Sequence, residues 1–179
     1  MMMRHLPLLL LASAAFADGA AADDPTVSCI AGGGGRLAME ISGAFEADID
    51  WGNEGTICEG GPRPEGDALR LMFSREEDGL LVVLGITGLR PGATGEGFLA
   101  NLTVVRQGLG EFYGTLGAEA CVVAVTRNDP DPAADAAYRV SGHGRCVASV
   151  EAIARDAEIR VAPFEFTGLA HWAPEEEEH

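Results

Sequence analysis

The residues of this sequence that are best placed to do chemistry are two carboxylates beside an aromatic ring. Asp48 and Asp50 stand two positions apart, and Trp51 follows directly. In an extended strand, residues two apart point to the same face, so the two carboxylates would lie side by side. Paired carboxylates are the groups that glycoside-hydrolysing sites use. One alternative function for the chain is therefore a carboxylate-dependent hydrolase.

Oxygen-bearing side chains also gather in one short segment later in the chain. The residues concerned are Asn128, Asp129, Asp131 and Asp135. Carboxylate and amide oxygens are the ligands that Ca²⁺ prefers, so this segment is a candidate calcium site. The same residue types are also the common formers of turns, and a plain loop is the alternative interpretation. We expect no other cofactor.

Other chemistry-bearing motifs are missing from the sequence. His143 alternates with Val140 and Cys146, which are expected to face the core, so His143 is expected to face solvent. There is no G-x-S-x-G nucleophile turn, and no pair of histidines has the spacing of a zinc site. Gly32–Gly35 offers the glycines of a phosphate-binding loop, but the chain has no lysine to meet a phosphate. These observations favour a non-catalytic function.

The composition limits the partners that the chain can bind. It has 179 residues, with 28 acidic residues against 12 basic ones, and its formal net charge is −16. Its hydrophobic content of 47% is enough to build a core. Nucleic acids and anionic lipid surfaces are bound by clustered cations, so we expect neither as a partner. A protein partner is expected to be basic and to bind in a salt-sensitive way.

The first residues read as an export signal. Residues 1–17 begin with a basic stretch that contains Arg4, continue with an apolar run from Leu6 to Phe16, and end in a small-x-small cleavage site. Cleavage there would make Asp18 the first residue of the mature chain. No apolar stretch approaches the roughly 20 residues that a membrane-spanning helix requires. We therefore expect a periplasmic or secreted protein without a membrane span.

The cysteines fit an oxidising compartment. There are four of them, Cys29, Cys58, Cys121 and Cys146. An even number of cysteines in an exported chain predicts two disulfides, and no two cysteines have the close spacing of a zinc knuckle. Four cysteines allow three pairings. We expect Cys29 to pair with Cys58 and Cys121 with Cys146, because each of these pairs closes a short local loop.

Hydrophobic periodicity predicts an all-β chain. From Leu37 to Trp51 apolar residues alternate with polar and acidic ones, and Gly43 is expected to bend or divide this strand. Further strands are expected at residues 69–73, 80–86, 98–105, 121–126, 138–146 and 159–166. We expect residues 128–132, which contain two prolines, to form a loop. Residues 150–155 are expected to form a short helical turn.

About eight short strands separated by turns are typical of an antiparallel β-sandwich with an immunoglobulin-like layout. A partly closed antiparallel β-barrel follows from the same pattern and is the alternative architecture. Alternating strands and long helices are missing, which excludes a parallel βαβ sheet. We expect one domain over residues 18–173, followed by a disordered acidic tail at residues 174–179.

The leading interpretation is an exported, non-catalytic binding or interaction module. It rests on the missing catalytic motifs and on a layout that often serves recognition, which is an argument by analogy. A second alternative, besides the hydrolase, is a β-barrel that carries a small apolar ligand. The residues expected to line its cavity are Leu37, Met39, Phe45, Phe98 and Phe112.

Overall fold

The computed structural model describes residues 27–63, 68–117 and 119–172. The predicted signal peptide, residues 1–17, and the predicted acidic tail, residues 174–179, lie outside them. The described chain is almost entirely antiparallel β-structure, as the periodicity predicts. No helix in this described part is long and apolar enough to cross a membrane.

The described residues form twelve strands and one short 3-10 turn. In chain order these are β1 (Arg36–Gly43), β2 (Ala47–Trp51), β3 (Ile57–Pro62), β4 (Ala68–Arg75), β5 (Leu80–Thr87), β6 (Gly95–Arg106), η1 (Gln107–Leu109), β7 (Glu111–Gly114), β8 (Cys121–Pro130), β9 (Ala137–Cys146), β10 (Val150–Ala152), β11 (Glu158–Val161) and β12 (Phe164–His171). The expected long strand is indeed divided after Gly43, and its two halves, β1 and β2, pair as an antiparallel hairpin.

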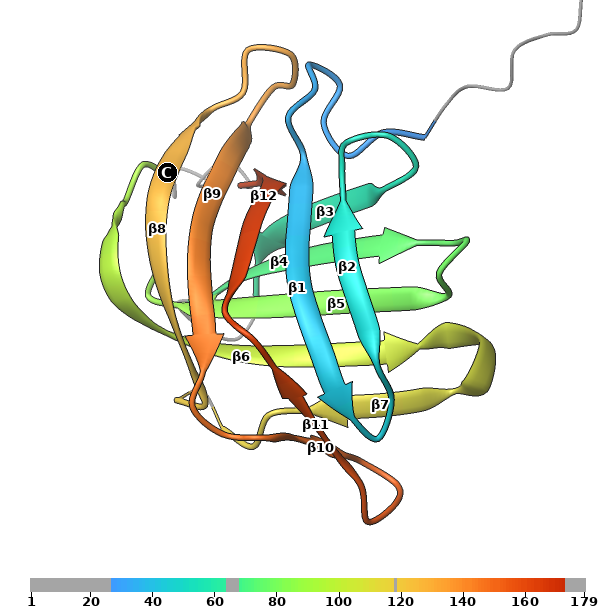
Figure 1. Ribbon diagram of the computed structural model, residues 1–179. Coiled ribbons are helices and arrows are strands. Elements are labelled where there is room, and N and C mark those ends of the chain that lie inside the picture. Colours follow the sequence, from blue (N-terminus) through green and yellow to red (C-terminus); the bar gives the residue numbers. More distant parts are fainter. Residues whose placement is uncertain (1–26, 64–67, 118, 173–179) are drawn as a thin grey trace, which may run out of the picture.

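The strands lie in two layers that cross steeply (Figure 1). Strands β8, β9, β12, β1 and β2 make the front layer of this view, and β3 to β7 make the back layer. The sheet runs in the order β3-β4-β5-β6-β7-β10-β11-β1-β12-β9-β8, and β8 pairs again with β6. This last pairing closes part of the sheet into a ring. The predicted antiparallel sandwich is therefore confirmed. Its two layers cross steeply, as in an orthogonal packing, and the sheet closes partly at one corner.

The core lies between the layers because the inward positions of each strand are apolar. In the β1–β2 hairpin, Leu37 lies opposite Trp51 and Met39 opposite Ile49, and all four side chains are buried. Tyr113 of β7 is also fully buried in this core. The alternate positions of β1 and β2 point to solvent, and they carry the acidic residues of the predicted pattern.

Both predicted disulfides are present with the predicted pairing. Cys121 and Cys146 are direct cross-strand partners in the β8–β9 hairpin. Cys29 and Cys58 join the segment before β1 to β3 in the back layer. Two disulfides are consistent with an oxidising location.

Three local predictions were wrong. Residues 128–130 belong to β8 and pair with β9, because Pro130 stands at the last position of the strand, where a missing N–H costs no ladder bond. Residues 150–152 form β10, which lies between β7 and β11, and not a helical turn. Residues 159–166 form two strands, because Pro163 interrupts them and β11 and β12 pair with different parts of β1.

Two glycines of β9 are required by close packing inside the front layer. Gly142 lies opposite Phe166 of β12, and Gly144 lies opposite Phe164. A Cβ atom on Gly142 would lie 2.2 Å from the backbone oxygen of Ala124 in β8 and 2.8 Å from the ring of Phe166. The aromatic rings of β12 thus fill the space that the missing side chains leave.

Candidate functional site

The outward positions of three neighbouring strands in the front layer bring four carboxylates together. Asp50 of β2 lies opposite Ala38 of β1, and Ala38 in turn lies opposite Glu165 of β12. One step along the hairpin, Glu40 lies opposite Asp48. We call Glu40, Asp48, Asp50 and Glu165 the acidic face.

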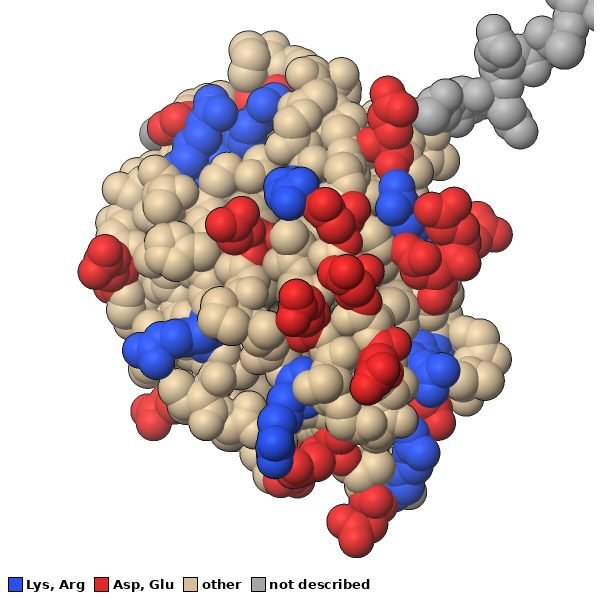
Figure 2. Space-filling model, in the orientation of Figure 1, with Lys and Arg blue, Asp and Glu red and all other residues tan. Residues whose placement is uncertain are grey.

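The acidic face surrounds a shallow hollow on the surface. The hollow has a volume of about 500 Å³, and Ala38 lies among the four carboxylates that line it. Arg36 of β1 also lines the hollow, as do Ala162 and Pro163 between β11 and β12. Figure 2 shows acidic side chains gathered over β1 and β2 on this side of the molecule. A small residue at the centre of a ring of carboxylates leaves room for a cationic side chain.

Among the residues that the structure describes, most of this negative charge has no ion-pair partner. Arg36 pairs with Asp50 at 2.8 Å, but both side chains are largely exposed, so the pair is weak. Glu40, Asp48 and Glu165 make no ion pair with any other residue in the described ranges. Like charges directly opposite each other in a sheet, such as Glu40 and Asp48, destabilise it. The repulsion between these carboxylates therefore lowers the stability of the fold without a gain in packing. Local destabilisation of this kind is often found at functional surfaces.

A second hollow adjoins the acidic face. It has a volume of about 480 Å³ and is lined by β8 and β9 residues, among them Ala124, His143 and Arg145. Pro163 lines both hollows, so they lie side by side. His143 is exposed, as its alternation predicts, and it is the cross-strand neighbour of Glu165. Together the two hollows form a depression across the outer surface of the front layer.

The structure separates the residues of the predicted hydrolase site. Asp48 and Asp50 do share one face of β2, as predicted. Trp51, however, points into the core and is only 2% exposed. The aromatic ring thus lies on the opposite side of the strand from the carboxylates and cannot stack on a ligand bound to them.

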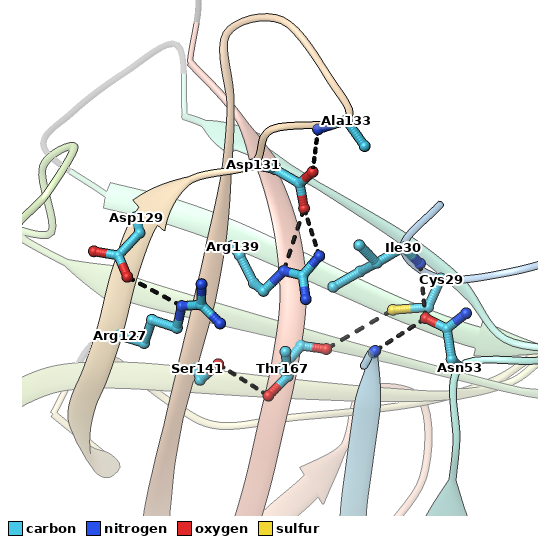
Figure 3. A network of polar contacts seen from close by, with 11 residues as sticks. Cys29, Ile30, Asn53, Arg127, Asp129, Asp131, Ala133, Arg139, Ser141 and Thr167 are labelled. Carbon is cyan, nitrogen blue, oxygen red and sulfur yellow. Dashed lines mark hydrogen bonds and ion pairs between the residues drawn. The ribbon is translucent and has the colours of Figure 1, made fainter. Parts of the chain in front are cut away.

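Two of the candidate calcium residues, Asp129 and Asp131, each bind an arginine of the protein (Figure 3). Asp131 is buried and accepts hydrogen bonds from Nη2 and Nε of Arg139, at 2.8 and 3.2 Å, and from the backbone N–H of Ala133, at 2.8 Å. The hydrogen bonds from Arg139 and then Ala133 hold the pKa of Asp131 below its usual value, against the opposing effect of burial. Both carboxylate oxygens of Asp131 are therefore already bound by the protein.

The other three candidate calcium residues either contact other groups of the protein or are exposed to solvent. Asn128 is buried and donates from Nδ2 to the backbone oxygens of Arg90 and Ala93. Asp129 pairs with Arg127, and Asp135 is exposed. Among the residues that the structure describes, no group of three or more acidic, histidine or cysteine side chains is arranged to hold a metal ion. Calcium binding by this hairpin stays a prediction.

Four of the five residues predicted to line a ligand cavity lie in or against one hydrophobic core, and Phe112 does not. Leu37 and Met39 are buried in the core, and Phe45 and Phe98 pack against its margin. Phe112 lies on the outer surface and is 49% exposed. Phe112 was expected to face inward, but the inward aromatic residue of β7 is Tyr113, one position later.

Comparison of the chain with protein-family models, with curated proteins and with solved structures found no match. Sequence reasoning found Asp48 and Asp50 but did not assign Glu40 or Glu165 to them. Glu40 follows the same alternation and could have been included. Glu165 joins the acidic face only through the pairing of β12 with β1, which no local pattern predicts.

Proposed function

We propose that this protein is an exported, non-catalytic binding module that recognises a cationic protein segment through its acidic face. The observation that carries the proposal is the set of carboxylates on Glu40, Asp48 and Glu165, which have no ion-pair partner in the described chain and surround a hollow. Lysine or arginine side chains that entered the hollow would relieve the repulsion between these carboxylates. The periplasm, or the space outside the cell, is the compartment that fits the predicted signal peptide and the two disulfides.

Two further features support a basic partner. The net charge of −16 attracts cations over distances beyond direct contact and speeds their encounter at low salt. The depression across the front layer is shallow, and its floor is made of strand residues, so it suits a chain laid across the sheet better than an enclosed small molecule. Recognition of this kind draws its affinity from many moderate contacts, so it is sensitive to ionic strength.

A matched pair of variants tests the proposal. The probe is a fluorescent heptapeptide in which lysine and valine alternate, and its affinity is measured by anisotropy at low and at physiological salt. The triple variant Glu40→Gln, Asp48→Asn, Glu165→Gln is expected to bind it about tenfold more weakly, since three contacts of about 0.5 kcal/mol each are lost. The control variant is Glu59→Gln, Glu151→Gln, Asp156→Asn, which removes the same charge from other exposed positions.

The control variant separates a specific site from general attraction to an acidic protein. Its affinity for the peptide at physiological salt is expected to fall by no more than about twofold. None of its three positions lines the hollow of the acidic face, and exposed charges are screened beyond a Debye length of ~8 Å. An equal loss in both triple variants would show that net charge alone attracts the peptide, and it would overturn the assignment of the acidic face.

A further inference from the structure

Strand β2 ends the front layer with an unpaired edge. It pairs with β1 on one side, and no strand in the described part of the chain pairs with its other side. The other terminal strand, β3, is covered: a Cβ atom on Gly60 would lie 2.5 Å from the backbone oxygen of Leu169 in β12. Figure 1 shows β2 at the margin of the front layer, crossing in front of the back strands. Unpaired edges of this kind are where a partner chain can add a strand.

The backbone groups of Asp48 and Asp50 point to this edge. The oxygen of Glu40 accepts a hydrogen bond from the N–H of Ala162, at 3.0 Å, on the side of β1 away from β2. In an antiparallel pair, the N–H and C=O of one residue point to the same side, and hydrogen-bonded pairs alternate with non-hydrogen-bonded ones. Glu40 and Asp48 are therefore a non-hydrogen-bonded pair. It follows that Asp48, and Asp50 two positions on, direct their N–H and C=O groups away from β1.

The space beside this edge has an inner side of mixed character and an acidic outer side. A hollow of about 270 Å³ lies along β2. Phe45, Ile49, Trp51 and Leu80 give it apolar lining, and the cationic side chain of Arg106 also lines it. The carboxylates of Asp48 and Asp50 stand on the outer side of the same strand. Asp78, in the turn between β4 and β5, is exposed and adds a third carboxylate to the lining of the hollow besides Glu46 and Asp48.

We propose that the cationic partner binds by adding an extended strand to the free edge of β2. Its backbone would bond to the N–H and C=O groups of Asp48 and Asp50, its basic side chains would point outward to the acidic face, and its apolar side chains would point inward to the hollow. The partner class is thus a segment in which basic and apolar residues alternate. This inference rests on the proposed function, and it adds the mode of binding.

A second copy of this chain does not fit the same edge. Antiparallel pairing of β2 with its own copy would place Asp48 and Asp50 against the same residues of the copy. Like charges opposite each other destabilise a sheet, so the edge disfavours self-association. A basic segment meets the same carboxylates with opposite charge.

Two substitutions at one position separate backbone pairing from charge. Asp48→Asn and Asp48→Pro remove the same carboxylate, but only proline also removes the N–H, which β1 does not use. With the alternating lysine–valine peptide as the probe, Asp48→Asn is expected to weaken binding about twofold, through the lost charge. Asp48→Pro is expected to weaken it by about a further fivefold, through the lost backbone hydrogen bond.

Amide hydrogen exchange of the wild-type protein gives an answer that does not depend on how well the proline variant folds. Saturating peptide is expected to slow exchange at the amides of Asp48 and Asp50. Equal affinities of the two Asp48 variants, together with unchanged exchange at both amides, would overturn strand addition. The proposed function would survive that result if the triple variant still bound more weakly than its control. The proposed function itself would be contradicted if both triple variants bound the peptide as tightly as the wild type.

Discussion

Arg139 neutralises the one acidic side chain that the described structure buries. The side chain of Asp131 is 1% exposed, and that of Arg139 is 17% exposed. Sequence reasoning placed Asp131 in a metal site because it counted oxygen ligands along the chain. The competing ligand, the guanidinium of Arg139, sits across the hairpin and could be identified only once the register of β8 and β9 was known.

Loss of this pair is expected to destabilise the fold. Arg139→Met should lower the free energy of unfolding by about 2 kcal/mol at pH 7, because the carboxylate of Asp131 stays buried without its main donor. The pKa of Asp131 is lowered in the folded state, so its ion pair stabilises the protein above the unfolded pKa, near 3.8, and this stabilisation is lost as the pH falls through the lower folded pKa.

Denaturant unfolding of both proteins between pH 7 and pH 3 measures this effect. The difference in stability between wild type and Arg139→Met is expected to shrink as the pH falls towards 3, because the buried Asp131 of the variant, without its guanidinium partner, takes up a proton. Arg127→Met is the control, since the Arg127–Asp129 pair is exposed and should contribute less than about 1 kcal/mol. A difference that stayed constant over this pH range would show that the effect of Arg139 is not electrostatic.

At the scale of strands, the sequence predicted what is local and missed what depends on distant partners. The division of the first long strand at Gly43 and both disulfides follow from alternation and loop length over short stretches, whereas the pairing of β1 with β2 was not predicted. Strand β10 was mistaken for a helical turn because its three residues are a strand only through their pairing with β7 and β11. Strand β3 was missed because it contains Gly60, Gly61 and Pro62, which have low strand propensity.

The close packing around Gly142 of β9 leads to a prediction about stability. Gly142→Ala is expected to destabilise the protein by about 3 kcal/mol, the upper end for overpacking, since the new methyl group would press on the backbone oxygen of Ala124. Gly108→Ala, in η1, is the matched control because a Cβ there meets nothing within 4 Å. Thermal unfolding followed by circular dichroism compares the two. Equal melting temperatures for both variants would contradict the close packing of Phe166 on Gly142.

At the scale of the whole molecule, the acidic face depends on the order of strands around the ring. Glu40, Asp48 and Asp50 come from a hairpin near the start of the described chain, whereas Glu165 comes from near its end. They meet because β12 inserts between β1 and β9. Composition predicted an acidic protein with a basic partner, but it could not say where on the surface the charge would be left unpaired. That placement requires the long-range pairing of β1 with β12.

The most direct test of this account is a map of where the alternating lysine–valine peptide binds. Backbone amide chemical shifts of the ¹⁵N-labelled protein would be followed by NMR as the peptide is added. The account predicts that the shifts concentrate in β1, β2 and the start of β12, with the largest changes at Asp48 and Asp50. Shifts spread evenly over the acidic surface, or centred on the exposed apolar side chains of Phe112 and Ile153, would contradict it.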